Sequence, residues 1–214
     1  DWSRANPLSS LQQLARLKGV GLLVGVVACA GLAQFTLYTT WVLYATFKFG
    51  WGPTENGWSL FAVGIMSALV QGVLLGRLLK RFSAQRIAVW GLVSSTTAFA
   101  LWGWVPEGWM MYAVIFANVL GPAVAASLQS LVSRAADERN QGQTLGAMGS
   151  LSSLMAVIAP AFGAPLLGLV SHFPKGDWRI GAPMYFCAAL QACALLLAVL
   201  HFRREARLHP LPLS

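Results

Sequence analysis

The sequence predicts an all-α membrane protein with six transmembrane helices, and three observations lead to this fold class. Apolar residues make up 57% of the 214-residue chain and charged residues only 10%, against roughly 25% charged residues in ordinary soluble domains. Six segments lack Asp, Glu, Lys and Arg, and each has at least the ~20 residues that a helix needs to cross the hydrocarbon of a bilayer. These segments are continuously apolar, without the period-two alternation of membrane β-strands.

Charged residues and prolines bound the first three predicted helices, which cover residues 19–47, 54–76 and 87–106. The first lies between Lys18 and Lys48. Pro53 precedes the second, at a position where its fixed φ angle and missing N–H group cost least. The third begins after Arg86 and ends at Pro106.

The last three predicted helices cover residues 108–133, 141–172 and 180–202. Glu107 precedes the fourth helix and Arg134 follows it. Pro174 and Gly176 lie beyond the fifth, and Arg203 follows the sixth. Because the connections are short, helices that are neighbours in sequence are expected to run antiparallel. Buried helices of a soluble protein are the alternative, but six such segments would leave no polar outer face.

The 15 Lys and Arg residues are distributed unequally between the two sides of the predicted bundle: Lys48, Lys175 and Arg179 lie on one side and the other twelve on the opposite side. The positive-inside rule places the side with twelve in the cytoplasm. Residues 1–17 are then the end of a cytoplasmic central linker within a longer polypeptide, and residues 203–214 are a cytoplasmic tail. Anionic lipid head groups account for the net charge of +8, so nucleic acid is not expected as a partner.

Polar residues inside the predicted helices are amides, hydroxyls and aromatic side chains. Gln34, Tyr38 and Trp41 have the i, i+4, i+7 spacing of one helix face. Aromatic faces with a few polar groups suit a large amphipathic ligand, while hydrogen bonding between helices is the alternative interpretation. The full set of substrate-path candidates is Gln34, Tyr38, Trp41, Gln71, Ser95 and Asn118.

The sequence offers no basis for an enzyme, a metal site or a cofactor. The cysteines, Cys29, Cys187 and Cys193, all lie inside predicted helices, where a free thiol behaves as a small apolar side chain. The three histidines are scattered, and a nucleophile would need an oriented base near it. We therefore do not expect an enzyme.

Glycine and proline are concentrated in the fifth predicted helix, at Gly142, Gly146, Gly149, Pro160 and Gly163. Small residues on one stripe let two helices approach closely, and prolines permit a bend. This pattern predicts either a helix that bends during function or tight packing alone.

The loop sequence GRLLKRFSAQR, residues 76–86, joins the second and third predicted helices and contains basic residues but no acid. Its position makes it cytoplasmic under the charge rule. The residues of interest are Gly76, Arg77, Lys80, Arg81 and Arg86.

Several stretches together resemble one family, the tetracycline-resistance type of major facilitator drug:proton antiporters, in its C-terminal six-helix half. The resemblance covers nearly the whole chain, in order and with matching spacing. It is carried by NPLSSL at 6–11, WVLYATFKFGW at 41–51, VQGVLLGRLLKRF at 70–82, EGW at 107–109, SLQSLVSR at 127–134 and QGQTLGAMGSLSSLMAVIAP at 141–160.

This resemblance implies a twelve-helix transporter of the bacterial inner membrane, in which this chain supplies helices seven to twelve. The implied partners are the lipid bilayer, the N-terminal six-helix half, a small-molecule substrate and protons. Two six-helix halves would rock about a site near the middle of the bilayer. By the same likeness Gly76 would allow a tight turn, and the four basic residues of the loop would contact helix ends or acids when the cytoplasmic side closes. Anchoring of the topology alone is the alternative role.

Two positions depart from the family pattern. Ser95 stands where tetracycline pumps commonly carry an acidic residue, and Ser67 lies near a position where some carry histidine, whereas Gln71 matches a glutamine thought to line the path. These departures argue against tetracycline itself as substrate and place any proton-carrying acid outside this half. The sequence thus predicts part of a proton-coupled efflux transporter for a drug-like or small organic molecule, with a non-transporting membrane scaffold or assembly protein as the rival.

Overall fold

The computed structural model describes residues 21–135 and 141–208, and every regular element within them is a helix. The predicted linker, residues 1–17, lies outside the described residues, as does the end of the predicted tail. The α-helices are α2 (Gly21–Phe49), α3 (Pro53–Leu69), α4 (Leu75–Leu79), α5 (Ala84–Trp104), α6 (Gly108–Ala117), α7 (Ala123–Ala135), α8 (Gln141–Ile158), α9 (Pro160–Val170) and α10 (Ala182–Leu208). A π-helical segment η2 (Val70–Leu74) and a 3₁₀ turn η4 (Trp178–Gly181) complete the set.

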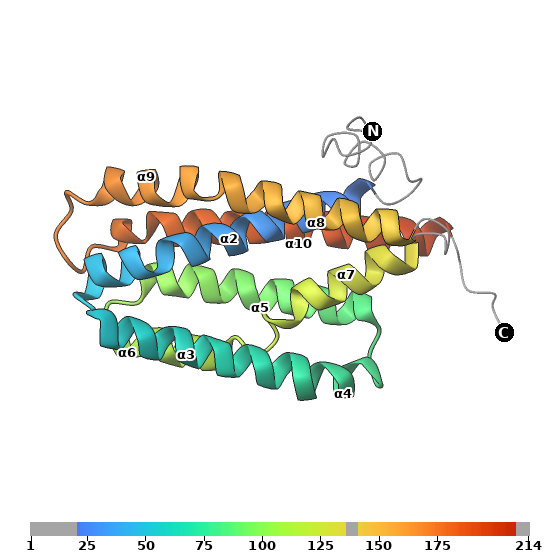
Figure 1. Ribbon diagram of the computed structural model, residues 1–214, viewed down its shortest axis with the longest axis horizontal. Coiled ribbons are helices and arrows are strands. Elements are labelled where there is room, and N and C mark those ends of the chain that lie inside the picture. Colours follow the sequence, from blue (N-terminus) through green and yellow to red (C-terminus); the bar gives the residue numbers. More distant parts are fainter. Residues whose placement is uncertain (1–20, 136–140, 209–214) are drawn as a thin grey trace.

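Five helical segments of the described chain are long and apolar enough to cross a membrane: Gly21–Phe49, Pro53–Leu79, Ala84–Trp104, Thr144–Val170 and Trp178–Arg207. They lie side by side along the long axis of the molecule (Figure 1). α2 begins and α10 ends at the same end of the bundle (Figure 1). The all-α membrane fold predicted from the sequence is therefore confirmed.

Local signals in the sequence fix several helix ends. Gly50 follows α2 with a φ angle of 71°, a left-handed conformation that glycine adopts without a Cβ penalty. Pro53 occupies the first turn of α3, and the Glu55 carboxylate accepts a hydrogen bond of 2.9 Å from the Gly52 N–H. At the start of α5, the Ser83 hydroxyl accepts a hydrogen bond of 3.4 Å from the Arg86 N–H.

The fourth predicted helix, residues 108–133, is not continuous in the structure. α6 ends at Ala117 and α7 begins at Ala123, so the segment contains two short helices with a break between them. Asn118 leaves the helical conformation, with φ −79° and ψ 50°. Pro122 has no N–H group and cannot continue the hydrogen-bond ladder of α6. The charge-free length of the segment predicted its extent, but composition carries no information on an internal break.

The other predicted helices differ from the observed ones mainly at their ends. The second runs from Pro53 to Leu79 through a single turn of π-helix. The fifth is divided at Ala159, directly before Pro160. α10 continues to Leu208, so the expected tail from residue 203 begins as helix, because charged side chains such as Arg203 and Arg204 are good helix formers outside the apolar segment.

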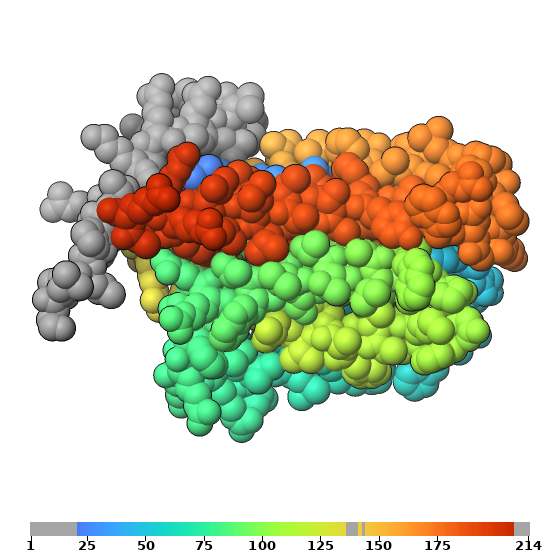
Figure 2. All heavy atoms as spheres, turned by 180° about the vertical axis from the view of Figure 1, so that it is seen from behind, coloured from blue at the N-terminus to red at the C-terminus, as the bar shows by residue number. Residues whose placement is uncertain are grey.

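α2 and α10 form the centre of the bundle. α10 packs against both α2 and α5, and α8 and α9 pack against α2 from the other side (Figure 1). Figure 2 shows α10 running the length of the rear face beside α5. Two buried clusters follow this arrangement, one around Trp41, Phe99 and Met184, and one around Val26, Leu92 and Ala194.

Large apolar side chains are exposed along α3 and α4. Within the most hydropathic window of Pro53–Leu79 only 17% of the residues are buried, and Trp58 and Phe61 are 61% and 56% exposed. Contiguous apolar surface of this kind marks contact with lipid or another chain rather than with water. The protein is therefore a multi-pass membrane protein, with lipid as its surroundings.

A polar-lined cleft as candidate functional site

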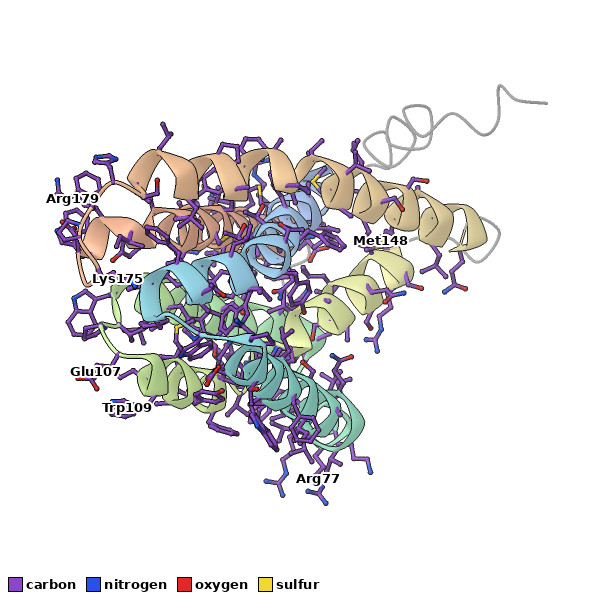
Figure 3. The ribbon with its side chains drawn as sticks, turned by 60° about the vertical axis from the view of Figure 1, so that its left-hand side comes forward. Arg77, Glu107, Trp109, Met148, Lys175 and Arg179 are labelled. Carbon is purple, nitrogen blue, oxygen red and sulfur yellow. The ribbon has the colours of Figure 1, made fainter. Side chains whose placement is uncertain are left out.

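A cleft of about 490 Å³ opens within the bundle between α2, α3, η2, α5, α7, α8 and α10. All six substrate-path candidates named from the sequence line this one cleft, although they come from four separate segments of the chain. Met148 of α8, labelled in Figure 3, lines it as well. The additional polar residues of its lining are Ser67, Gln129, Ser152 and Gln191.

The aromatic part of the cleft comes from α2 and α5. Trp41 is 3% exposed, and its indole Nε1–H donates a hydrogen bond of 2.9 Å to the Ser59 hydroxyl of α3. Its ring meets the Trp102 ring edge-on, with 4.9 Å between the centroids. These contacts fix the orientation of Trp41. Gln34 is half-buried and Tyr38 is exposed, so the stripe predicted on α2 runs from a rigid aromatic wall toward an open edge.

Gln71 lies in η2, where five residues form one turn of π-helix inside an otherwise α-helical segment. A π turn adds a residue to the helix and rotates the side chains that follow, and such turns are frequent at functional sites. Gln71 is exposed to the cleft, whereas the preceding Val70 is 2% exposed and belongs to an apolar cluster.

The break between α6 and α7 forms another wall of the cleft. The Asn118 Oδ1 atom accepts a hydrogen bond of 2.8 Å from the Ser94 hydroxyl of α5. The Asn118 amide lies over Gly121 and would overlap with any Cβ there. At Gly91 a Cβ would meet the Leu120 carbonyl oxygen at 2.8 Å. The missing side chains at Gly91 and Gly121 thus let the break sit directly against α5.

Among the described residues that line the cleft there is no Asp, Glu, Lys, Arg or His. Its polar groups are the amides of four glutamines and one asparagine, three serine hydroxyls and the phenol of Tyr38. Among the described residues no group of three metal-ligating side chains is close enough to hold an ion. Such a site can bind an uncharged or aromatic molecule through hydrogen bonds and ring packing, and its side chains offer no pair for acid–base chemistry.

The basic loop is found at one end of the bundle, between α4 and α5. Gly76 lies inside α4 rather than at the turn, which falls at residues 80–83, so the expectation that Gly76 allows a tight turn is wrong. The helical segment Pro53–Leu79 continues through position 76, since a glycine costs a helix only about 1 kcal/mol. Arg77, Lys80, Arg81 and Arg86 are all exposed, and Arg77 points away from the bundle (Figure 3).

The glycines of the fifth predicted helix fall into two groups. Gly142, Gly146 and Gly149 are exposed on α8, with no atom of the described chain within 4 Å of a Cβ built there. Gly163 is buried on α9, where a Cβ would overlap with the Thr40 hydroxyl of α2. The Gly163 position is therefore a close helix contact, and Pro160 is the first residue of α9. Whether α8 and α9 bend during function stays a prediction.

Lys48 is a buried cation that sequence reasoning treated only as the boundary of a helix. It is 5% exposed, and its Nζ donates hydrogen bonds to the Tyr44 hydroxyl at 2.8 Å and to the Gly103 carbonyl oxygen at 2.7 Å. The Tyr44 hydroxyl in turn donates to the Trp102 carbonyl oxygen at 2.7 Å. The network ties the end of α2 to the end of α5. In the sequence, this contact is indicated only by the spacing of Tyr44 and Lys48, which are four residues apart on one helix.

Asp177 and Arg179 form the ion pair at the same end of the bundle, with 2.8 Å between Arg179 Nη2 and Asp177 Oδ2. Hydrogen bonds from Arg179 hold the pKa of the Asp177 carboxyl below its usual range. Asp177 also accepts a hydrogen bond of 2.9 Å from the Arg179 N–H at the start of η4. Arg179 is exposed and Asp177 partly buried, so the pair contributes little Coulomb energy and serves mainly to shape the turn before α10.

A bundle of membrane-length helices around an uncharged polar cleft defines a polytopic membrane protein with an internal cleft. The chain belongs to the Major Facilitator Superfamily, whose family model matches residues 23–214. It is similar to the class D tetracycline resistance protein of Salmonella ordonez, with 34% identity over 182 residues. The class E tetracycline resistance protein of Escherichia coli is 27% identical over 202 residues, which is 94% of this chain.

These alignments cover only part of each relative. The class D protein is matched over 85% of this chain but 46% of its own length, and the class E protein over 47% of its length. The chain therefore spans about half the length of the curated relatives it matches. A more distant relative, the Hippocampus abundant transcript-like protein 1 of Rattus norvegicus, is 26% identical over 160 residues.

Proposed function

We propose that this chain is the C-terminal half of a secondary transporter that exports a drug-like or small organic molecule from the bacterial cytoplasm in exchange for protons. The observation that carries the proposal is the single cleft in which all six predicted polar and aromatic residues meet. Membership of the Major Facilitator Superfamily and the similarity to tetracycline resistance proteins support it. An N-terminal half would close the open side of the cleft.

Irregular backbone at the cleft supports the same conclusion. Inside a bilayer, non-helical backbone is tolerated where protein buries it or where it lines a wet cavity. The break at residues 118–122 and the π turn at residues 70–74 both contribute to the cleft lining. Transporters commonly build their central sites from such interrupted helices.

Proton coupling requires acidic groups that this cleft does not provide. Ser95, which stands at a position where tetracycline pumps commonly carry an acid, is a 2% exposed hydroxyl in the cleft wall. We therefore assign the proton-carrying carboxylates to the N-terminal half. The same substitution is the reason that tetracycline is not proposed as the preferred substrate.

The export assay uses alanine at Gln34, Trp41 and Gln71 in the full-length protein. We expect each substitution to reduce export by about ten-fold, because one lost hydrogen bond or aromatic contact is worth about 1.4 kcal/mol. The measurement is cellular accumulation of tetracycline and chloramphenicol, with the amount of protein in the membrane determined in parallel. Trp58→Ala is the matched control, since Trp58 is 61% exposed and lies outside the cleft.

Two results would overturn this assignment. Export that survives all three substitutions, with unchanged expression, would remove the cleft as the substrate path. A wild-type protein that exports none of a broad drug panel would favour the non-transporting scaffold, in which the amides only tie helices together.

We further propose that the loop between α4 and α5 and both ends of the chain face the cytoplasm. The test is labelling of intact cells with a membrane-impermeant maleimide, using Arg77→Cys and Trp109→Cys in a background without native cysteines. Arg77 is exposed at one end of the bundle and Trp109, 62% exposed, at the other (Figure 3). We expect Trp109→Cys to be labelled at once and Arg77→Cys only after permeabilisation; the reverse order would invert the topology.

The basic loop then has a role at the cytoplasmic face. We propose that Arg77, Lys80, Arg81 and Arg86 contact acidic groups or helix ends of the N-terminal half when that face closes. Their exposure supports this, because the four guanidinium and ammonium groups are accessible to a partner surface.

A further inference from the structure

Gln191 is a buried amide at the centre of α10 and is not one of the six substrate-path candidates. The residue is 2% exposed and lines the cleft. Its Oε1 atom is buried and has no hydrogen-bond partner among residues 21–135 and 141–208. A buried carbonyl oxygen without a donor is unfavourable, so its retention calls for an explanation.

Packing between helices does not explain why a buried oxygen without a hydrogen-bond donor is retained at Gln191. α10 contacts both α2 and α5 along most of its length, yet the Gln191 oxygen accepts no hydrogen bond from either helix. The Asn118 amide in the same cleft behaves differently, since its oxygen is paired with the Ser94 hydroxyl. The Gln191 oxygen therefore has no donor among the described residues, whereas the Asn118 oxygen already has one.

The surroundings of Gln191 define what can pair with it. No charged side chain lines the cleft in the part of the chain that the structure describes, and the aromatic wall of the cleft includes Trp41, Phe99 and Trp102. An uncharged molecule with an apolar or aromatic body can pack on that wall, while an O–H or N–H group of the molecule donates to the amide oxygen. A permanent cation would find no countercharge among the described residues of this lining.

We propose that Gln191 is a specificity-determining residue of the transport site, whose side-chain oxygen accepts a hydrogen bond from a hydroxyl or N–H group of an uncharged substrate. The inference rests on the proposed transport function and deepens it by naming the substrate class. A site that pairs a substrate donor with a buried acceptor discriminates strongly against molecules that lack the donor.

The first test needs no ligand and uses the melting temperature of the purified full-length protein. In the Gln191→Leu variant the unpaired amide is replaced by an apolar group of similar size, so we expect the melting temperature to stay unchanged or rise. Gln85→Leu is the matched control, because Gln85 lies outside the cleft and its amide donates to Glu205 at 3.1 Å. A clear fall for Gln191→Leu alone would make Gln191 a structural tie and overturn the proposal.

The second test measures binding by equilibrium dialysis with two probes. Chloramphenicol is uncharged and has hydroxyl and amide donors, whereas tetraphenylphosphonium is a permanent aromatic cation without donors. We expect wild-type protein to bind chloramphenicol in preference, and Gln191→Leu to weaken chloramphenicol binding about ten-fold while leaving tetraphenylphosphonium unchanged. Equal weakening of both probes, no weakening, or a wild-type preference for the cation would each contradict the assignment.

The two tests separate this inference from the proposed function. Selective loss of chloramphenicol binding in a protein that exports nothing would support Gln191 as an acceptor and contradict export. Export that continues unchanged in Gln191→Leu, with unaltered binding, would support the proposed export function and contradict the role of Gln191 as an acceptor. If the wild-type protein binds neither probe, the melting temperatures decide: a fall overturns the role of Gln191, and an equal or higher value supports it.

Discussion

Gly181→Ala is expected to cause the largest loss of folded protein among the substitutions considered. A Cβ at Gly181 would meet the Gly103 Cα at 2.7 Å, far inside van der Waals contact. The obstructing atoms are backbone, so they cannot rotate away, and α5 and η4 would have to separate. We expect a loss of about 3 kcal/mol, at the upper end of the range for overpacking, read as a lower melting temperature in detergent.

Gly64→Ala is the matched control for this prediction. The same methyl group is added, but nothing lies within 4 Å of a Cβ at Gly64, and alanine favours helix over glycine by about 1 kcal/mol. We expect its melting temperature to equal or exceed that of the wild-type protein. A Gly181→Ala variant as stable as Gly64→Ala would show that the close contact between Gly103 and Gly181 is not required.

Asn118→Leu is expected to reduce export strongly while part of the protein population remains folded. The substitution removes the acceptor of the Ser94 hydroxyl and places a branched side chain where the amide now covers Gly121. We expect a loss of about 2 kcal/mol in stability and a fall in export of at least about ten-fold at equal membrane expression. Drug accumulation in cells and the melting temperature of purified protein are the two measurements.

The control lies on the same helix as Ser94. Thr97→Val removes a hydroxyl that is exposed and bonds only to the Val93 carbonyl oxygen of its own helix, at 2.9 Å. We expect export and stability close to wild type. Export retained in Asn118→Leu would indicate that the break between α6 and α7 is a packing feature and that substrate does not pass beside it.

The candidate site was partly predictable from the sequence. Gln34, Tyr38 and Trp41 share a helix face by their spacing alone, and a lone amide such as Gln71 inside an apolar segment must face protein or a cavity. Gln191 has the same local signal, yet nothing in the sequence states whether its oxygen is paired. Lys48 follows the first predicted helix and indicates only where that helix ends. Its burial cannot be predicted from the sequence, because it depends on a hydrogen bond to the Gly103 carbonyl oxygen, 55 residues away.

The class of protein and the approximate positions of its apolar helical segments follow from the sequence alone. Long charge-free segments are stable in a bilayer only as helices, since every backbone group must be hydrogen-bonded within the segment, and this holds whatever the neighbours are. The positions of the helix breaks and the contacts between distant residues depend instead on tertiary packing. The break beside Asn118 and the contact of Gly103 with Gly181 depend on side chains that are missing on a facing helix, which no local pattern in one segment can specify.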